Sequence, residues 1–202
     1  MTRLGVLGGT FNPPHRGHLA LARHALRELA LERVLLMPAH TAPNKAGGGD
    51  EALDPGPQRR LAMCRLACEG VPGVCACALE VERGGVSYTV DTLAALHASH
   101  PQAELTLIVG ADVAGTLGSW REPRRLLELA RVAVAARPGA DVPALPPAAR
   151  VRRLEMEPVE VSSSLVRRRV ARGEPIEALV GQRVAAYVAE HALYRVASGA
   201  RA

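Results

Sequence analysis

Gly8-Gly9-Thr10-Phe11-Asn12-Pro13-Pro14-His15-Arg16-Gly17-His18-Leu19 is the stretch from which the fold can be read. A short apolar run, 4–7, precedes it, and an amphipathic run, 19–31, follows it. This succession is typical of a strand, a glycine turn and a helix. The free N–H groups at such a helix start point at whatever lies over the turn, and the glycines let a phosphate approach the backbone closely. The stretch therefore predicts an anion site.

His15 and His18 lie three residues apart at the predicted helix start, so they share one face of that helix. Imidazole can donate to phosphate oxygens, and nucleotidyl transfer needs positioning and charge neutralisation rather than a protein nucleophile. Gly5, Gly8 and Gly9 do not form G-x-G-x-x-G, and no Gly-Lys-Ser/Thr follows, which disfavours dinucleotide redox binding and P-loop hydrolysis. Two other interpretations of the histidines stay open: helix-start caps and zinc ligands.

Strand and helix patterns alternate along the rest of the chain, and repeated β-α units with buried strands predict a parallel sheet. We expect one α/β domain over 1–197, a Rossmann-like doubly wound parallel sheet with helices on both faces and a small C-terminal helical portion. Residues 198–202 are expected to form a disordered tail. The predicted strands are 3–8, 33–37, 74–82, 105–109, 132–136 and 151–156, and the predicted helices are 16–31, 58–68, 87–99, a short one near 117, 123–130, 163–171 and 182–191.

Three segments should meet at the carboxyl edge of this sheet, where ligands bind at the reversal of strand order. They are the opening stretch, Gly110-Ala111-Asp112 after a buried strand, and Val161-Ser162-Ser163-Ser164 with Arg167 one turn later. Hydroxyls, free N–H groups and a guanidinium all suit phosphate. The plainer alternatives are a serine N-cap with a solvated arginine, and an aspartate that caps a short helix. The glycine- and proline-rich segment 39–57 is too long for a simple connection and is predicted to be a mobile functional loop.

Composition narrows the class of protein. The chain has 202 residues, a formal net charge of +5 and only 2% aromatic residues. We find no signal-peptide pattern and no run of about 20 apolar residues, so a cytoplasmic protein is expected, without a membrane partner. The four cysteines have spacings of neither a zinc knuckle nor a redox pair, which favours buried free thiols, with a metal site as the alternative: Cys64, Cys68, Cys75 and Cys77.

Two of these motifs resemble the signatures of one superfamily. Gly8-Gly9-Thr10-Phe11-Asn12-Pro13-x-His15-x-Gly17-His18 and Val161-Ser162-Ser163-Ser164-Leu165-Val166-Arg167 resemble the nucleotidyltransferases with paired H-x-G-H-type histidines. Within that superfamily the chain resembles the bacterial nicotinate-nucleotide adenylyltransferases. The stretches that carry this closer resemblance are Ala42-Pro43-Asn44-Lys45, Ser87-Tyr88-Thr89, Gly110-Ala111-Asp112 with Trp120 downstream, and Tyr187 to Tyr194-Arg195.

The resemblance implies an activity and a role for each matching residue. The implied reaction transfers AMP from ATP to nicotinate mononucleotide by direct in-line attack, giving nicotinate adenine dinucleotide and pyrophosphate, with Mg²⁺ carried mainly by the ATP phosphates and no protein metal ligand. Asp112 would take the adenosine ribose hydroxyls and Trp120 would stack on the pyridine ring. The implied catalytic residues are His15, His18 and Arg167; the implied ATP-binding residues are Gly8, Gly9, Thr10, Phe11, His15, His18, Gly110, Asp112, Ser162, Ser163 and Arg167; the implied substrate-binding residues are Lys45, Tyr88, Thr89 and Trp120.

Asn12 and Asn44 depart from the pattern, because aspartate and histidine are usual at these two positions. The nearest rival function is a sister adenylyltransferase acting on nicotinamide mononucleotide or phosphopantetheine. Trp120 argues against phosphopantetheine, which has no ring to stack. The positive net charge suggests a nucleic-acid-binding module, but the chain lacks the stacking residues and basic clusters that such modules use, so no nucleic-acid partner is expected. The oligomeric state, a homo-oligomer included, stays open.

Overall fold

Six parallel strands form one sheet at the centre of the computed structural model, which describes residues 2–43, 53–141, 145–146, 149–157 and 159–195. The strand order is β3-β2-β1-β4-β5-β6, and every neighbouring pair runs parallel. The order reverses between β1 and β4, as a doubly wound sheet requires. The strands are β1 (Arg3–Gly9), β2 (Arg33–Pro38), β3 (Val74–Ala76), β4 (Glu104–Gly110), β5 (Ala130–Ala136) and β6 (Val151–Glu155).

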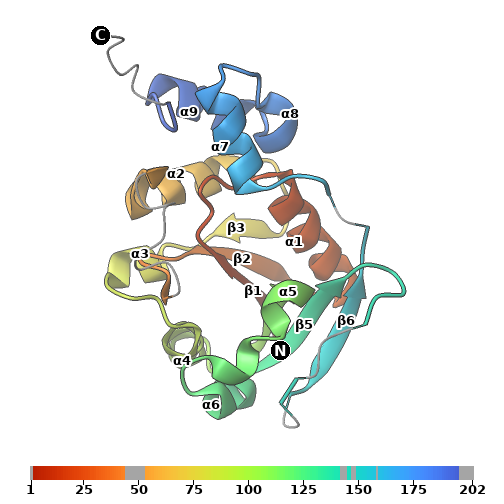
Figure 1. Ribbon diagram of the computed structural model, residues 1–202. Coiled ribbons are helices and arrows are strands. Elements are labelled where there is room, and N and C mark those ends of the chain that lie inside the picture. Colours follow the sequence, from red (N-terminus) through yellow and green to blue (C-terminus); the bar gives the residue numbers. More distant parts are fainter. Residues whose placement is uncertain (1, 44–52, 142–144, 147–148, 158, 196–202) are drawn as a thin grey trace.

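Helices cover both faces of the sheet (Figure 1). On one face, buried side chains of α1 and α2 pack against strand residues such as Leu36 and Ile108. On the other face, α4 and α6 pack against residues such as Val6 and Leu107. The predicted Rossmann-like α/β architecture is confirmed. The helices are α1 (Arg16–Glu28), α2 (Pro57–Cys68), α3 (Leu79–Arg83), α4 (Thr89–Ser99), α5 (Ala111–Ala114), the 3₁₀ helix η3 (Leu117–Ser119), α6 (Pro123–Leu129), α7 (Ser163–Ala171), α8 (Glu177–Val180) and α9 (Gln182–Glu190).

The C-terminal helices form the predicted small helical portion. Figure 1 shows α7, α8 and α9 gathered beside α2, away from α4 and α6. Met63 and Ala67 of α2 belong to the same buried cluster as Val166 of α7 and Val184 of α9. This cluster attaches the end of the chain to the part of the fold that carries the opening turn.

The predicted strand over 74–82 is wrong in its second half. Only Val74–Ala76 is strand, and Leu79–Arg83 forms the helix α3. The alternation of apolar and acidic residues in this segment suggests a half-exposed strand, yet the Glu80 side chain is buried and accepts a hydrogen bond from Thr92 Oγ1 at 2.6 Å. Gly84, with φ of +74°, ends the helical turn. A buried polar contact across the fold thus outweighs the local periodicity.

The cysteines are free thiols, and Cys64 and Cys68 are buried. Burial raises the pKa of all four thiols, that of Cys68 to about 12, which makes them poor nucleophiles at neutral pH. Within the described parts of the chain, no helix has the length and apolar character needed to cross a membrane. Lys45, Asn44 and the 198–202 tail lie outside the described residues.

Candidate active site

The turn after β1 is held by residues that lie about 150 positions later in the chain. Ser163 Oγ donates a hydrogen bond to the carbonyl oxygen of Pro13 at 2.8 Å, and Arg167 Nη1 donates to the carbonyl oxygen of Asn12 at 2.7 Å. Phe11 in the same turn is 2% exposed and has a φ of +52°. The structure therefore brings the two sequence motifs together at the carboxyl edge of β1.

The serines and the arginine of the second motif are already engaged with the protein. Ser162 is the N-cap of α7, and its Oγ accepts the Leu165 N–H at 3.1 Å. Arg167 is 5% exposed, so it is not the solvated arginine of the plainer alternative, and its Nη2 also donates to Ser164 Oγ at 3.3 Å. These contacts make α7 a support for the turn, with its first N–H groups at the same edge.

His15 and His18 form a stacked pair at the start of α1. Their ring centroids are 3.6 Å apart with an interplanar angle of 23°, and the Phe11 ring meets His18 edge-on at 4.8 Å. His15 is the N-cap, and its backbone N–H donates to His18 Nδ1 at 3.1 Å. Because Nδ1 of a neutral His18 accepts, the ring proton is assigned to Nε2. His18 can therefore present a neutral N–H donor to a ligand.

Both imidazoles are neutral at physiological pH. Burial lowers the pKa of His15 to about 4. Burial, and then the proximity of His15, lowers the pKa of His18 to about 3. A bound polyphosphate favours the protonated form of a neighbouring imidazole, so the pair is a site at which anion binding and proton binding support each other.

Gly17 allows close packing around this pair. A Cβ at position 17 would lie 3.1 Å from His15 Nδ1 and 3.1 Å from Val161 Cγ1. The glycine between the two histidines thus lets α1 approach both the imidazole and the segment before α7. His15 Nδ1 is itself buried and has no hydrogen-bond partner among the residues that the structure describes.

Two other glycines border open space at the ends of adjacent strands. Among the described residues, a Cβ built at Gly8, in β1, or at Gly110, at the end of β4, would meet no atom within 4 Å. Asp112 is exposed in the first turn of α5, and Gly110, not Asp112, is the N-cap of that helix. This backbone surface with an exposed carboxylate beside it is suited to a nucleoside that approaches the strand ends.

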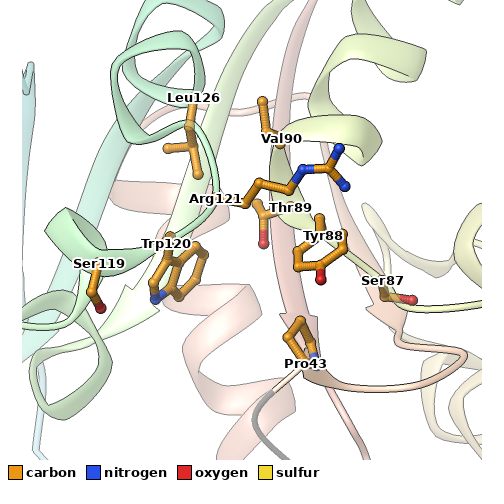
Figure 2. A pocket seen from close by; sticks show the side chains of 9 residues that line it. All are labelled: Pro43, Ser87, Tyr88, Thr89, Val90, Ser119, Trp120, Arg121 and Leu126. Carbon is orange, nitrogen blue, oxygen red and sulfur yellow. The ribbon is translucent and has the colours of Figure 1, made fainter.

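A cavity of about 200 Å³ lies beside the start of α4. Figure 2 shows Trp120 and Tyr88 on opposite sides of it, with Pro43 at its edge. Tyr88 is the N-cap of α4 and Thr89 its first residue, so the first N–H groups of that helix border the cavity. Trp120 Nε1 donates to Thr116 Oγ1 at 2.9 Å, which orients the indole ring. The cavity is lined by Pro43, Ser87, Tyr88, Thr89, Val90, Ser119, Trp120, Arg121 and Leu126.

Arg121 lies at the edge of this cavity and is paired with two carboxylates. Its guanidinium carbon lies 4.6 Å from the centroid of the Tyr88 ring, its Nη1 lies 3.5 Å from Asp91 Oδ2, and its Nε lies 3.7 Å from Glu122 Oε1. These two negative groups offset the Arg121 charge, so the positive end of the α4 dipole is the feature that favours an anion in this space. The arrangement suits a flat ring that carries a negative group.

Sequence reasoning missed two residues that support the opening turn. Tyr194 Oη donates to Asn12 Oδ1 at 2.8 Å, and burial raises the pKa of its phenol. Arg60 is 1% exposed and donates to the carbonyl oxygen of Thr10 at 2.9 Å. The signal for Arg60 was its place on α2 one turn before Cys64, on the apolar side of the helix.

Comparisons with known proteins give consistent matches over nearly the whole chain. The family model described as cytidylyltransferase-like matches residues 6–169. A probable nicotinate-nucleotide adenylyltransferase from Roseiflexus sp. (strain RS-1) is 44% identical, over 95% of this chain and 98% of the relative. Another, from Bordetella avium (strain 197N), is 40% identical over 98% of this chain and 100% of the relative.

Solved structures share the fold at low sequence identity. The nicotinic acid mononucleotide adenylyltransferase of Plasmodium falciparum, solved in complex with NaAD, superposes with a TM-score of 0.77 at 15% identity, covering 96% of this chain and 98% of that one. The same protein in complex with APC gives a TM-score of 0.75 at 14% identity, with the same coverage.

Proposed function

The chain belongs to the cytidylyltransferase-like family and, within it, to the nicotinate-nucleotide adenylyltransferases, and from this premise we propose the reaction and the residues that perform it. The enzyme transfers AMP from ATP to nicotinate mononucleotide, giving nicotinate adenine dinucleotide and pyrophosphate. One observation carries the proposal: two phosphate-binding motifs about 150 residues apart meet at one sheet edge through the Ser163–Pro13 and Arg167–Asn12 hydrogen bonds, with the stacked histidines on the same turn.

The ATP phosphates lie against the starts of α1 and α7. The N–H groups of both helix starts and the Nε2–H of His18 donate to phosphate oxygens, and His15 contributes the second imidazole. Arg167 holds the turn through Asn12 and adds positive charge. The adenosine part of ATP lies beside Gly8, Gly110 and Asp112, where it can approach the glycine backbone closely.

Catalysis is positioning and charge neutralisation, without a covalent enzyme intermediate. A phosphate oxygen of nicotinate mononucleotide attacks the α-phosphorus of ATP, the new P–O bond forms, and the bond to the bridging oxygen of the β-phosphate breaks to release pyrophosphate. His18 and the helix-start amides stabilise the charge that develops on the α-phosphoryl oxygens. Mg²⁺ enters as MgATP, as part of the substrate; among the residues that the structure describes, no three His, Cys, Asp or Glu side chains cluster to hold a metal.

The cavity beside α4 takes the nicotinate ring. Trp120 and Tyr88 provide the faces for the ring, and the helix-start N–H groups at Thr89 suit its carboxylate. The N–H groups at the start of α4 favour the acid over the amide nucleotide, because only the acid carries a negative group on the ring. Lys45 of the 39–57 loop is proposed to reach the phosphates, and it lies outside the described residues.

The test is pyrophosphate release from MgATP with nicotinate mononucleotide, nicotinamide mononucleotide and phosphopantetheine in parallel reactions. We expect the acid nucleotide to give the highest kcat/KM. A preference for phosphopantetheine would contradict the assignment of the cavity, and an equal rate with the amide would contradict the role of the N–H groups at the start of α4. Binding of labelled RNA or DNA without any pyrophosphate release would instead support the nucleic-acid-binding alternative.

A further inference from the structure

Arg60 is a fully buried arginine whose donors all reach the loops around the site. It is 1% exposed, and Nε donates to Asp54 Oδ1 at 2.9 Å. Nη1 donates to the carbonyl oxygens of Thr10 at 2.9 Å and Ala39 at 2.6 Å, and Nη2 donates to that of His40 at 2.9 Å. Three backbone carbonyls from two different loops therefore share one guanidinium.

These two loops serve different substrates in the proposed reaction. Thr10 precedes Phe11, whose ring contacts His18, so its loop belongs to the ATP phosphate side. The loop after β2 belongs to the nicotinate side, because the His40 N–H donates to Ser87 Oγ at 2.9 Å and Ser87 lines the cavity. Ser87 N–H in turn donates to the Thr41 carbonyl at 2.9 Å.

We propose that Arg60 is a positioning residue for adenylyl transfer, which sets the separation between the ATP phosphate turn and the wall of the nicotinate cavity. The inference rests on the proposed function. Arginine suits this task because its planar fork holds several acceptors in a fixed geometry, which a lysine ammonium does not. Only one other described hydrogen bond directly joins the same two loops, from the Ala39 N–H to the Gly9 carbonyl at 2.9 Å.

Loss of the Arg60 guanidinium leaves the ATP phosphate turn and the nicotinate cavity each intact and alters the distance between them. A displacement of about 1 Å between reacting groups can lower a rate on the order of 10²-fold. We therefore expect Arg60→Lys and Arg60→Met to lower kcat on the order of 10²-fold, with less than about threefold change in the Kd of either nucleotide measured alone. A purely structural arginine would change the fraction of folded enzyme and leave kcat per folded molecule unchanged.

The experiment compares these two variants with Arg59→Met, a matched control at the exposed neighbouring arginine on α2. Calorimetry gives the separate Kd values for ATP and nicotinate mononucleotide, urea unfolding gives the folded fraction, and pyrophosphate release gives kcat per folded molecule. Arg59→Met is expected to match the wild type in all three. If Arg60→Met does not fold, the kcat per folded molecule of Arg60→Lys tests the inference by itself.

A further measurement tests whether Arg60 acts through the loop after β2. Ser87→Ala removes the acceptor of the His40 N–H, so its effect on kcat should be non-additive with that of Arg60→Lys. Unchanged kcat per folded molecule in Arg60→Lys, a loss explained wholly by one Kd, or strict additivity with Ser87→Ala would each overturn the inference. A wild-type enzyme that fails to turn over ATP with nicotinate mononucleotide would instead overturn the proposed function, so the two failures are distinguishable.

Discussion

Two substitutions at His18 separate the two nitrogens of its ring. Nδ1 accepts the His15 backbone N–H at 3.1 Å, while Nε2 is the donor that we assign to the ATP phosphates. In His18→Asn, the amide oxygen can replace Nδ1 as acceptor, but nothing replaces Nε2–H. In His18→Gln, the amide nitrogen reaches the position of Nε2, but the acceptor close to the backbone is lost.

The two variants should therefore differ in opposite directions: His18→Asn should lose more of the rate, and His18→Gln should lose more of the stability. His18→Asn should lower kcat on the order of 10²–10³-fold, the usual cost of removing one donor that stabilises transition-state charge. Its free energy of unfolding at pH 7 should fall less than that of His18→Gln, because the hydrogen bond from the His15 backbone N–H is kept. His18→Gln should retain more of the rate and lose roughly 0.5–2 kcal/mol of stability, the usual cost of a lost N-terminal cap.

Pyrophosphate release at saturating MgATP and nicotinate mononucleotide measures the rate, and urea unfolding followed by circular dichroism measures the stability. If His18→Asn turned over like the wild type, or if His18→Gln were the slower and the more stable of the two, the assignment of the two nitrogens would be refuted. Arg23→Gln, at an exposed position of α1, provides the control.

The same pair predicts the pH dependence of stability. The pKa of His18 falls from an ordinary 6.5 to about 3 on folding, so below pH 6.5 the unfolded chain binds protons that the native imidazole does not. The free energy of unfolding therefore decreases as the pH falls from about 6.5 towards 3, and each pKa unit of depression corresponds to about 1.4 kcal/mol. His18→Asn lacks this group, so its stability should decrease less than that of the wild type between pH 6.5 and 4. Parallel pH profiles in urea would contradict the buried, neutral state.

Three further substitutions test the supports of the site. Trp120→Ala should raise the KM for nicotinate mononucleotide on the order of tenfold and leave the KM for ATP unchanged, because the indole is one face of the ring cavity; equal effects on both KM values would contradict this placement. Gly17→Ala should fail to gain the roughly 0.5–1 kcal/mol of stability in urea unfolding that alanine usually has over glycine inside a helix, because its Cβ would lie 3.1 Å from its neighbours, while Gly118→Ala, with 3.9 Å to the nearest atom, serves as control. Tyr194→Phe should cost about 1–3 kcal/mol because Asn12 Oδ1 loses its buried donor, and an unchanged urea midpoint would rule that hydrogen bond out as a support.

Continuous apolar segments made the architecture predictable from the sequence. The strands β1, β4 and β5 are buried on both faces, so their runs of valine, leucine and alanine admit few other interpretations. The prediction for 74–82 failed because its alternation favours a strand, and a buried contact of Glu80 outweighs that local pattern in the second half of the segment. Such a contact depends on Thr92, which no local pattern identifies.

The candidate site was predictable where its residues form contiguous motifs. The opening stretch and Ser162–Arg167 share an edge because parallel strands end there, which the topology alone implies. The place of Arg60 on the apolar side of α2 indicates burial, but its partners were not predictable, and neither was that of Tyr194, since these oxygens lie far away in the sequence.

The opening turn is held by residues that are synthesised much later than the turn itself, and this has a consequence for folding on the ribosome. All six strands have emerged once Glu155 has, yet the donors that hold residues 12 and 13 come from Ser163, Arg167 and Tyr194. Roughly 40 further residues must be added, which takes ~2–8 s at common rates of translation. A nascent chain can therefore carry the full sheet and lack the nucleotide site, so ATP binding would report that synthesis has passed Tyr194 as well as that the chain has folded.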